Sequence, residues 1–348
     1  MARAVLMIVM LSSVCCALVA DATQITTMRI AGESLVLAGR LPGNLMFADV
    51  VPGSIAIRST YELGDDTIVY EQGRDYVVNY TLGTIARSPA SRMPDFAKNM
   101  LYGQNNFDHS KFPGFSNHPF FVWVDYETRA GKNLAVKSNQ SALLSKTRKK
   151  LEAGGPFKLI AFGDSISTGC ETSREGLRFQ NLYAQALMKI FPKAQISVEM
   201  GATGGDTTLN GLERIEEKVL SRSPDLVLVA FGMNDHNVPP FGVGLDKFEE
   251  NLGHIINLIR TRTGAEIILL STLPPNPDWA FGSHQMDKYA AATKRVAEKK
   301  RVAYADVFSV WSGALVRKDP QSLLGNNINH PNDFGHWLYL QALKAVEF

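Results

Sequence analysis

The chain has 348 residues, of which 45% are hydrophobic and 20% are charged, and this composition is typical of a folded protein and not of a disordered one. A chain of this length suggests about two domains with ample buried core. The 36 Lys and Arg residues nearly balance the 34 Asp and Glu residues, and the net charge of +2 argues against a nucleic-acid partner bound through a dominant basic surface.

Residues 1–22 have the pattern of a cleavable export signal. A basic residue precedes an apolar run from Ala4 to Val19, and Ala20-Asp21-Ala22 fits the small-x-small rule for cleavage. The alternative is an uncleaved membrane anchor, but a run of 16 residues is shorter than the roughly 20 that span a bilayer. We therefore expect a secreted or periplasmic protein without stable membrane insertion, in which only Cys170 remains after cleavage and no intrachain disulfide can form.

Residues 23–127 predict a small β-sandwich domain. Short runs rich in β-branched and aromatic residues alternate with turn sequences such as Gln72-Gly73-Arg74-Asp75. The predicted strands are Ser54–Arg58, Thr67–Tyr70, Tyr76–Tyr80 and Phe120–Tyr126. The stretch from Phe96 to Phe115 is rich in aromatic residues and has little periodicity. We expect this long loop to pack against another part of the protein.

Residues 128–156 are predicted to form a linker between two domains. They are polar and basic, with one short helical pattern from Ser141 to Glu152, and they end in Gly154-Gly155-Pro156. The pattern of hydrophobic residues changes after this segment, which favours a domain boundary here.

From residue 157 to 348 apolar runs alternate with amphipathic helical patterns. The predicted strands are Lys158–Phe162, Gln195–Met200, Asp225–Phe231, Ala265–Ser271 and Arg301–Val307. One of the intervening helical faces carries Leu212, Ile215 and Val219 at spacings of three and four residues. This alternation predicts a parallel sheet covered by helices on both faces, with a ligand site at the carboxyl ends of the strands.

Four polar clusters fall where this rule expects a site. They are Gly163-Asp164-Ser165, Gly204-Gly205-Asp206-Thr207, Gly232-Met233-Asn234-Asp235 and Asn329-His330-Pro331-Asn332. Together they contain a hydroxyl nucleophile, a base, and amide donors for an oxyanion, which are the groups that acyl transfer requires. The sequence has no Gly-x-Ser-x-Gly elbow, no phosphate-binding Gly-x-x-x-x-Gly-Lys and no His-Glu-x-x-His zinc motif. We therefore expect acyl transfer without a cofactor or a metal.

The four clusters resemble, in the same order, the sequence blocks of the SGNH or GDSL hydrolase family across residues 158–345. The resemblance implies a flavodoxin-like three-layer α/β/α hydrolase domain at residues 157–348. It also implies that Ser165 is the nucleophile and His330 its general base. The oxyanion hole would consist of the backbone N–H groups of Ser165 and Gly205 and the side-chain amide of Asn234. These roles agree with the chemistry, because a serine hydroxyl needs an imidazole to take its proton.

One position departs from the family's pattern. The family usually has Asp three residues before the catalytic His, whereas this chain has Asn327. We include Asn327 among the candidate catalytic residues, because its amide oxygen could accept a hydrogen bond from the imidazole Nδ1–H and fix the tautomer of His330. A backbone carbonyl or Asp333 could do the same.

Three further polar residues, in or next to the clusters, are expected to have more ordinary roles. Asp164 and Asp235 are expected to brace loops through hydrogen bonds and not to act as catalysts. His236 follows the third cluster. It is expected either to contact the substrate or to be a solvated loop residue.

These features predict a secreted two-domain serine esterase that removes O-acetyl or other short-chain acyl groups from polysaccharides. The expected partner is an acylated glycan or a small ester, and the sequence leaves the oligomeric state open. One alternative is a lipase, arylesterase or thioesterase of the same family. Another, suggested by Asn327, is a non-catalytic glycan-binding protein on a degenerate hydrolase fold. The aromatic stretch from Phe96 to Phe115 could stack on sugar rings, cover the pocket or pack between the domains.

Overall fold

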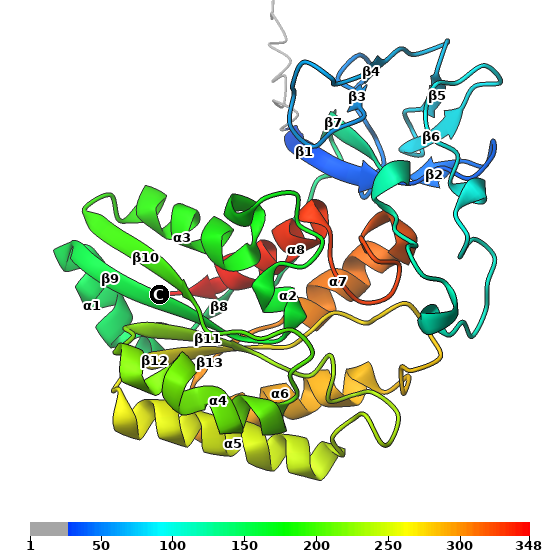
Figure 1. The fold of residues 1–348 in the computed structure, drawn as a ribbon. Coiled ribbons are helices and arrows are strands. Elements are labelled where there is room, and N and C mark those ends of the chain that lie inside the picture. Colours follow the sequence, from blue (N-terminus) through cyan, green and yellow to red (C-terminus); the bar gives the residue numbers. More distant parts are fainter. Residues whose placement is uncertain (1–26) are drawn as a thin grey trace, which may run out of the picture.

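The computed structural model describes residues 27–348, so the predicted export signal at residues 1–22 lies outside the described residues. A β-rich N-terminal region lies above a larger domain of strands and helices (Figure 1). Within the described residues, every helix is too short or too polar to cross a membrane.

Five parallel strands form the central sheet of the larger domain. They are β9 (Gly155–Gly163), β10 (Ala194–Met200), β11 (Leu226–Ala230), β12 (Glu266–Leu270) and β13 (Ala303–Ala305). Their order in the sheet is β10-β9-β11-β12-β13, which is the 2-1-3-4-5 order of flavodoxin-like folds. All five strands overlap the predicted runs, and β11 is buried at every position.

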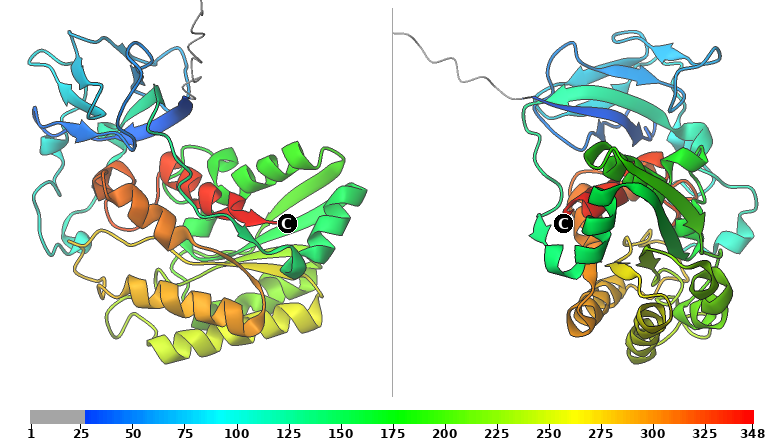
Figure 2. Two further views of the ribbon diagram at one scale, coloured as in Figure 1. Left: turned by 180° about the vertical axis from the view of Figure 1, so that it is seen from behind. Right: turned by 90° about the vertical axis from the view of Figure 1, so that its left-hand side faces the viewer.

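Helices cover both faces of this sheet (Figures 1 and 2). On one face lie α3 (Phe179–Ile190), α7 (Val307–Leu315) and α8 (Asp333–Lys344), and on the other lie α4 (Thr208–Lys218), α5 (Leu245–Arg262) and α6 (Met286–Lys300). The short helix α2 (Ser165–Thr168) follows β9 directly. The α/β fold with a parallel sheet is thus confirmed. Single 3-10 turns are η1 (Phe96–Lys98), η2 (His109–Lys111), η3 (His118–Phe120), η4 (Ser141–Leu143), η5 (Glu175–Leu177), η6 (Leu220–Arg222) and η7 (Pro320–Ser322).

Much of the segment 128–156 is built into the larger domain and is more than a linker. Strand β8 (Ser138–Asn139) pairs with β14 (Val346–Glu347), and α1 (Ser145–Ala153) packs against β9 and β10. Although α1 is mostly polar, its Leu151 is buried. One buried leucine on a helix of nine residues leaves little hydrophobic periodicity in the sequence.

The N-terminal region contains two antiparallel sheets. Its strands are β1 (Met28–Leu35), β2 (Gly43–Asn44), β3 (Ala56–Arg58), β4 (Val69–Tyr70), β5 (Tyr76–Asn79), β6 (Thr84–Arg87) and β7 (Val122–Thr128). One sheet has the order β1-β7-β3-β4 and the other β2-β6-β5. Strands β1, β2 and β6 were not predicted. The region is β-rich as expected, while its arrangement as a sandwich stays a prediction.

The N-terminal region holds the α7–α8 segment (residues 316–332), which carries His330. Lys318 of this segment forms an ion pair of 2.6 Å with Glu33 of β1, and both side chains are fully buried. The Ser34 hydroxyl donates a hydrogen bond of 2.5 Å to the Ser322 carbonyl. One continuous hydrophobic core runs through both parts of the chain. The two parts are therefore packed as one unit.

The long aromatic loop packs on the larger domain, which confirms that it is not a solvated linker. The Phe107 N–H donates to the Asp278 carbonyl at 2.8 Å, and the Ala280 N–H donates to the Phe107 carbonyl at 3.0 Å. Phe107 belongs to a second buried cluster with Leu101, Trp279 and Ile328, against which Phe112, Phe115 and Phe281 are partly buried.

Candidate active site

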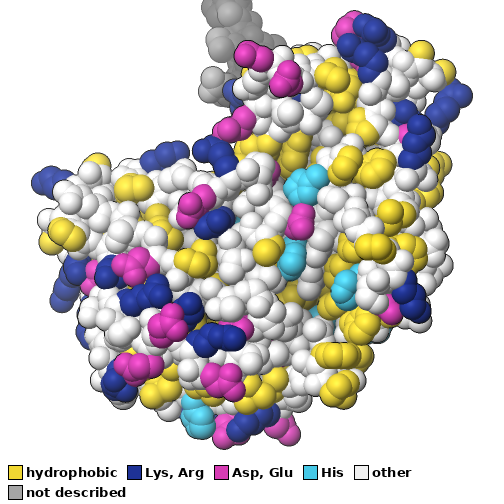
Figure 3. Space-filling view, viewed as in Figure 1, with side chains coloured by type: hydrophobic (Ala, Val, Ile, Leu, Met, Phe, Trp, Pro, Cys, Tyr) yellow, Lys and Arg dark blue, Asp and Glu magenta, His cyan; other side chains and the backbone are white. Residues whose placement is uncertain are grey.

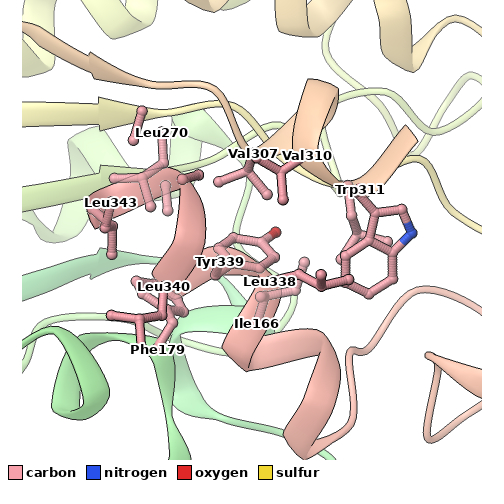
Figure 4. Packing of buried hydrophobic residues seen from close by; sticks show 14 of the residues in the cluster. Ile166, Phe179, Leu270, Val307, Val310, Trp311, Leu338, Tyr339, Leu340 and Leu343 are labelled. Atoms are coloured by element: carbon pink, nitrogen blue, oxygen red, sulfur yellow. The ribbon is translucent and has the colours of Figure 1, made fainter. Parts of the chain in front are cut away.

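Ser165 is held on a rigid turn at the carboxyl end of β9. The carboxylate of Asp164 caps this turn by accepting a hydrogen bond of 2.9 Å from the Ile166 N–H. Gly169 ends the turn in the left-handed conformation, with φ of 79°. Ile166 is 2% exposed and points into the core beside Leu338 of α8 (Figure 4). Ser165 is thus fixed by packing as well as by hydrogen bonds.

The Ser165 hydroxyl oxygen lies 2.8 Å from His330 Nε2, although the two residues are 165 positions apart in the chain. Asn326 braces the loop before α8, because its side-chain oxygen accepts the backbone N–H groups of Asn329 and His330 at 3.0 and 2.9 Å. Burial lowers the pKa of His330, and the nearby Glu171 carboxylate opposes this effect. The imidazole is therefore in its basic form at neutral pH, as general-base catalysis requires.

The three predicted oxyanion donors lie on neighbouring loops. A Cβ built on Gly204 would lie 3.8 Å from Ser165 Cβ, so the loop after β10 runs beside Ser165. Gly205 has a φ of 81° and faces open space, which leaves room for a substrate oxygen. The Asn234 amide donates one hydrogen bond of 3.0 Å to the Asp206 carbonyl, and its second N–H remains for an oxyanion. The site lies between β9 and β11, where the order of the strands reverses.

The buried acidic residues next to the site act as loop braces, as expected. Asp235 Oδ1 accepts hydrogen bonds from the Thr208 N–H at 2.9 Å and hydroxyl at 2.6 Å. Burial raises the pKa of Asp164 to about 7 and that of Asp235 to about 6. Within residues 27–348, no three His, Cys, Asp or Glu side chains are arranged to hold a metal ion.

His236 is a buried residue and not a solvated loop residue. Its side chain is fully buried, and its Nδ1 is hydrogen-bonded to the Met233 carbonyl. Burial lowers the pKa of His236 to about 4, so the ring is neutral at physiological pH. The expectation of a solvated residue was wrong, because the ring packs against Trp279 and Tyr289, at 6.3 and 6.4 Å between ring centroids. The expected substrate contact stays a prediction.

The structure does not bring the side chain of Asn327 to His330. The amide oxygen of Asn327 accepts weak hydrogen bonds from the side chains of Asn117 and Asn276, at 3.4 and 3.5 Å. Within residues 27–348, no hydrogen bond joins His330 Nδ1 to Asn327, to Asp333 or to a backbone carbonyl. The expected orienting contact is therefore missing, since Asn117 from the N-terminal region engages Asn327 instead.

A carboxylate that was not predicted lies next to the loop of His330. Glu171 Oε2 is 2.7 Å from Nε2 of His118, a residue of the N-terminal region. The Glu171 side chain also lies across Gly325, whose N–H donates a hydrogen bond of 2.9 Å to the His330 carbonyl. The one signal for Glu171 in the sequence is its place six residues after Ser165, and nothing in the sequence signals His118.

The buried carboxyl group of Asp164 makes stability depend on pH. Its folded-state pKa of about 7 exceeds the ordinary value of 3.8, so the folded protein binds this proton more tightly than the unfolded chain does. The stabilisation is complete below about pH 4 and is lost as the pH rises through about 7. We expect Asp164→Asn, which keeps an oxygen for the Ile166 N–H, to remove this part of the pH dependence. Between about pH 4 and 7 the free energy of unfolding of the variant should fall less, by a few kcal/mol, than that of the unmutated protein. Denaturant unfolding at several pH values measures this, and curves parallel to those of the unmutated protein would contradict it.

Known proteins that are similar to this chain include ester hydrolases. A model of the GDSL-like lipase/acylhydrolase family matches residues 161–338, which include all four polar clusters. An arylesterase of Vibrio mimicus is 30% identical over 154 residues, which are 43% of this chain and 70% of the relative. An acetylxylan esterase of Geobacillus stearothermophilus is 26% identical over 221 residues, which are 57% of this chain and 97% of the relative. A solved two-domain esterase active on acetylated mannans is 22% identical, with 59% of this chain and 52% of that chain covered and a TM-score of 0.49.

Proposed function

The chain belongs to the GDSL-like lipase/acylhydrolase family and is a carboxylic ester hydrolase, and from this premise we propose that it removes O-acetyl and other short-chain acyl groups from polysaccharides outside the cytoplasm. The observation that carries the proposal is the 2.8 Å contact between the Ser165 hydroxyl and His330 Nε2, beside the loops of Gly205 and Asn234. The export signal predicted for residues 1–22 supports the location.

The proposed hydrolysis has two half-reactions. In the first, the Ser165 hydroxyl oxygen attacks the ester carbonyl while His330 Nε2 takes its proton and passes it to the leaving sugar hydroxyl. In the second, the same imidazole activates a water molecule, which releases the acid and restores Ser165. The N–H groups of Ser165 and Gly205 and the Asn234 amide would stabilise the oxyanion, and one such donor contributes about 3 kcal/mol.

An aromatic wall beside the site supports a sugar substrate. It consists of Phe112, Phe115 and Phe281, which are partly buried against the buried Phe107 and Trp279, and of the exposed Phe241 beside Phe281. The Phe281 ring lies 5.8 Å from Phe241, on the loop after β11, and 6.1 Å from Trp279, which packs with Ile328 near His330. Phe241 is 61% exposed, and hydrophobic side chains gather on this side of the molecule (Figure 3). Exposed apolar patches next to a site often bind ligands, and aromatic rings offer flat faces to sugar rings.

A second candidate activity is the hydrolysis of aryl esters. The matched arylesterase favours it, and the same aromatic wall could hold an aromatic leaving group by ring stacking. The two candidates share the catalytic groups and differ only in the leaving alcohol, so substrate panels separate them.

We expect the protein to release acetate from acetylated xylan or mannan. Among p-nitrophenyl esters we expect the highest kcat/KM for acetate, with a decline beyond about six carbons, because each extra methylene needs a pocket that fits it. Acetate release and initial rates across acyl chains of increasing length measure these preferences, with Ser165→Ala as the background.

Each alternative has its own outcome in the same panel. A preference for long acyl chains would favour a lipase. Hydrolysis of phenyl acetate without acetate release from any polysaccharide would favour an arylesterase. No hydrolysis of any ester by the unmutated protein would favour a glycan-binding role.

A further inference from the structure

Two groups from different parts of the chain meet beside the catalytic imidazole. Glu171 comes from the loop after α2, and His118 comes from the turn η3 in the long loop of the N-terminal region. The Glu171 and His118 side chains are 26% and 38% exposed. Acidic and histidine side chains lie together in the hollow where the N-terminal region meets the larger domain (Figure 3).

We propose that Glu171 is a positioning residue for the proposed ester hydrolysis. Held by His118, its carboxylate supplies the negative charge that the family's Asp would supply at position 327, and it stabilises the protonated form of His330 during the reaction. The N-terminal region thereby takes part in catalysis through His118.

The backbone conformation of Glu171 directs its side chain toward the loop that carries His330. Glu171 has a φ of 70°, a left-handed conformation that is uncommon for a residue with a side chain and is often found at functional sites. In this conformation its side chain lies across Gly325, where a Cβ would come within 2.5 Å of Glu171 Cβ and 2.9 Å of Oε2. Only glycine at position 325 permits this approach. Because the Gly325 N–H is bonded to the His330 carbonyl, the carboxylate is anchored to the loop of the imidazole.

Among the charged groups near His330, Glu171 is the best candidate to stabilise the protonated imidazole. Among residues 27–348, the Glu171 carboxylate raises the pKa of His330 against the effect of burial. On α8, burial raises the pKa of Asp333, whose Oδ1 is bonded to the Ser173 N–H. Burial lowers the pKa of His336 to about 3, so that ring is neutral in the active pH range. His118 is hydrogen-bonded to Glu171, and Arg174, which is paired with Glu62, lies near enough to Asp333 to oppose the effect of burial on the pKa of Asp333.

The test is the pH profile of Glu171→Gln with p-nitrophenyl acetate as substrate. Removing the carboxylate charge lowers the pKa of His330, so the acidic limb of the kcat/KM profile should move to lower pH by roughly half to one unit. The plateau of kcat should fall about tenfold or more, because the imidazolium loses its counter-charge. KM should change much less than kcat.

Glu175→Gln is the matched control, because Glu175 lies on the same loop, is 74% exposed and pairs with Arg178. Its profile should match that of the unmutated protein. His118→Gln should shift the limb in the same direction as Glu171→Gln but less, and the two changes should be less than additive.

The other possible results of this experiment also test the proposed role of Glu171. A Glu171→Gln protein that loses activity with an unmoved acidic limb has lost only structural support, and this result would overturn the proposal, as would an unchanged profile. If Glu171→Gln does not fold, His118→Gln decides by the same shift of the limb. Full activity of Ser165→Ala would instead overturn the proposed function itself, so the two failures are distinguishable.

Discussion

Replacing Ser165 by alanine is expected to lower kcat for acetyl ester hydrolysis by about 10⁴-fold or more. The change removes only the oxygen that lies 2.8 Å from His330 Nε2. The Asp164 cap and the buried Ile166 remain, so the turn that carries position 165 should keep its shape. Initial rates with p-nitrophenyl acetate and thermal unfolding of the same samples measure both effects.

Ser167→Ala is the matched control for this prediction. Ser167 lies on the same turn and is fully buried, and its hydroxyl has no hydrogen-bond partner within residues 27–348. The same chemical change at this position should leave kcat unaltered and stability within about 1 kcal/mol. Equal losses in both variants would show that the turn, and not the Ser165 hydroxyl, is what the substitution disturbs.

Replacing Lys318 by methionine is expected to destabilise the protein by about 3–5 kcal/mol. The substitution leaves the buried Glu33 carboxylate without its cation. Its remaining partners are the Met46 N–H and the Tyr126 hydroxyl, each at 2.8 Å, and hydrogen bonds alone do not compensate a fully buried charge. Chemical denaturation measures the loss.

Two companion variants test the reason for this loss. Glu33→Gln combined with Lys318→Met removes both charges and keeps an acceptor for Met46 and Tyr126, so most of the stability should return. Lys137→Met breaks the exposed pair of Lys137 and Glu347, whose side chains are 65% and 42% exposed, and should cost under about 1 kcal/mol. A similar loss at both lysines would contradict the argument from burial.

The strands of the central sheet could be predicted because the residues that indicate them are adjacent in the sequence. Strands such as β11 and β12 are apolar on both faces, and this pattern is visible in the five residues of β11 and in the last four residues of β12. Strand β1 could not be predicted in this way. Its Glu33 and Ser34 are buried, but their partners Lys318 and Ser322 stand 285 and 288 positions away in the chain. Without those partners, both residues have the pattern of an exposed turn.

The same distinction applies to the active site. Ser165 and His330 were identified from short motifs, and the structure places them in contact. The surroundings of the imidazole depend on contacts between distant segments, such as Asn117 with Asn327 and His118 with Glu171. These contacts have no characteristic spacing, so the expectation for Asn327 failed and Glu171 was overlooked.

The residues of the N-terminal region that contact the α7–α8 segment lie outside the part of the chain that the family model matches. Glu33, Ser34 and Asn117 precede residue 161, where the family match begins, yet they hold the backbone from which His330 projects. Two homologous chains with identical catalytic blocks can therefore differ in how firmly this histidine is seated. Replacing the N-terminal part of the chain by a foreign one would therefore remove contacts that support the backbone of His330.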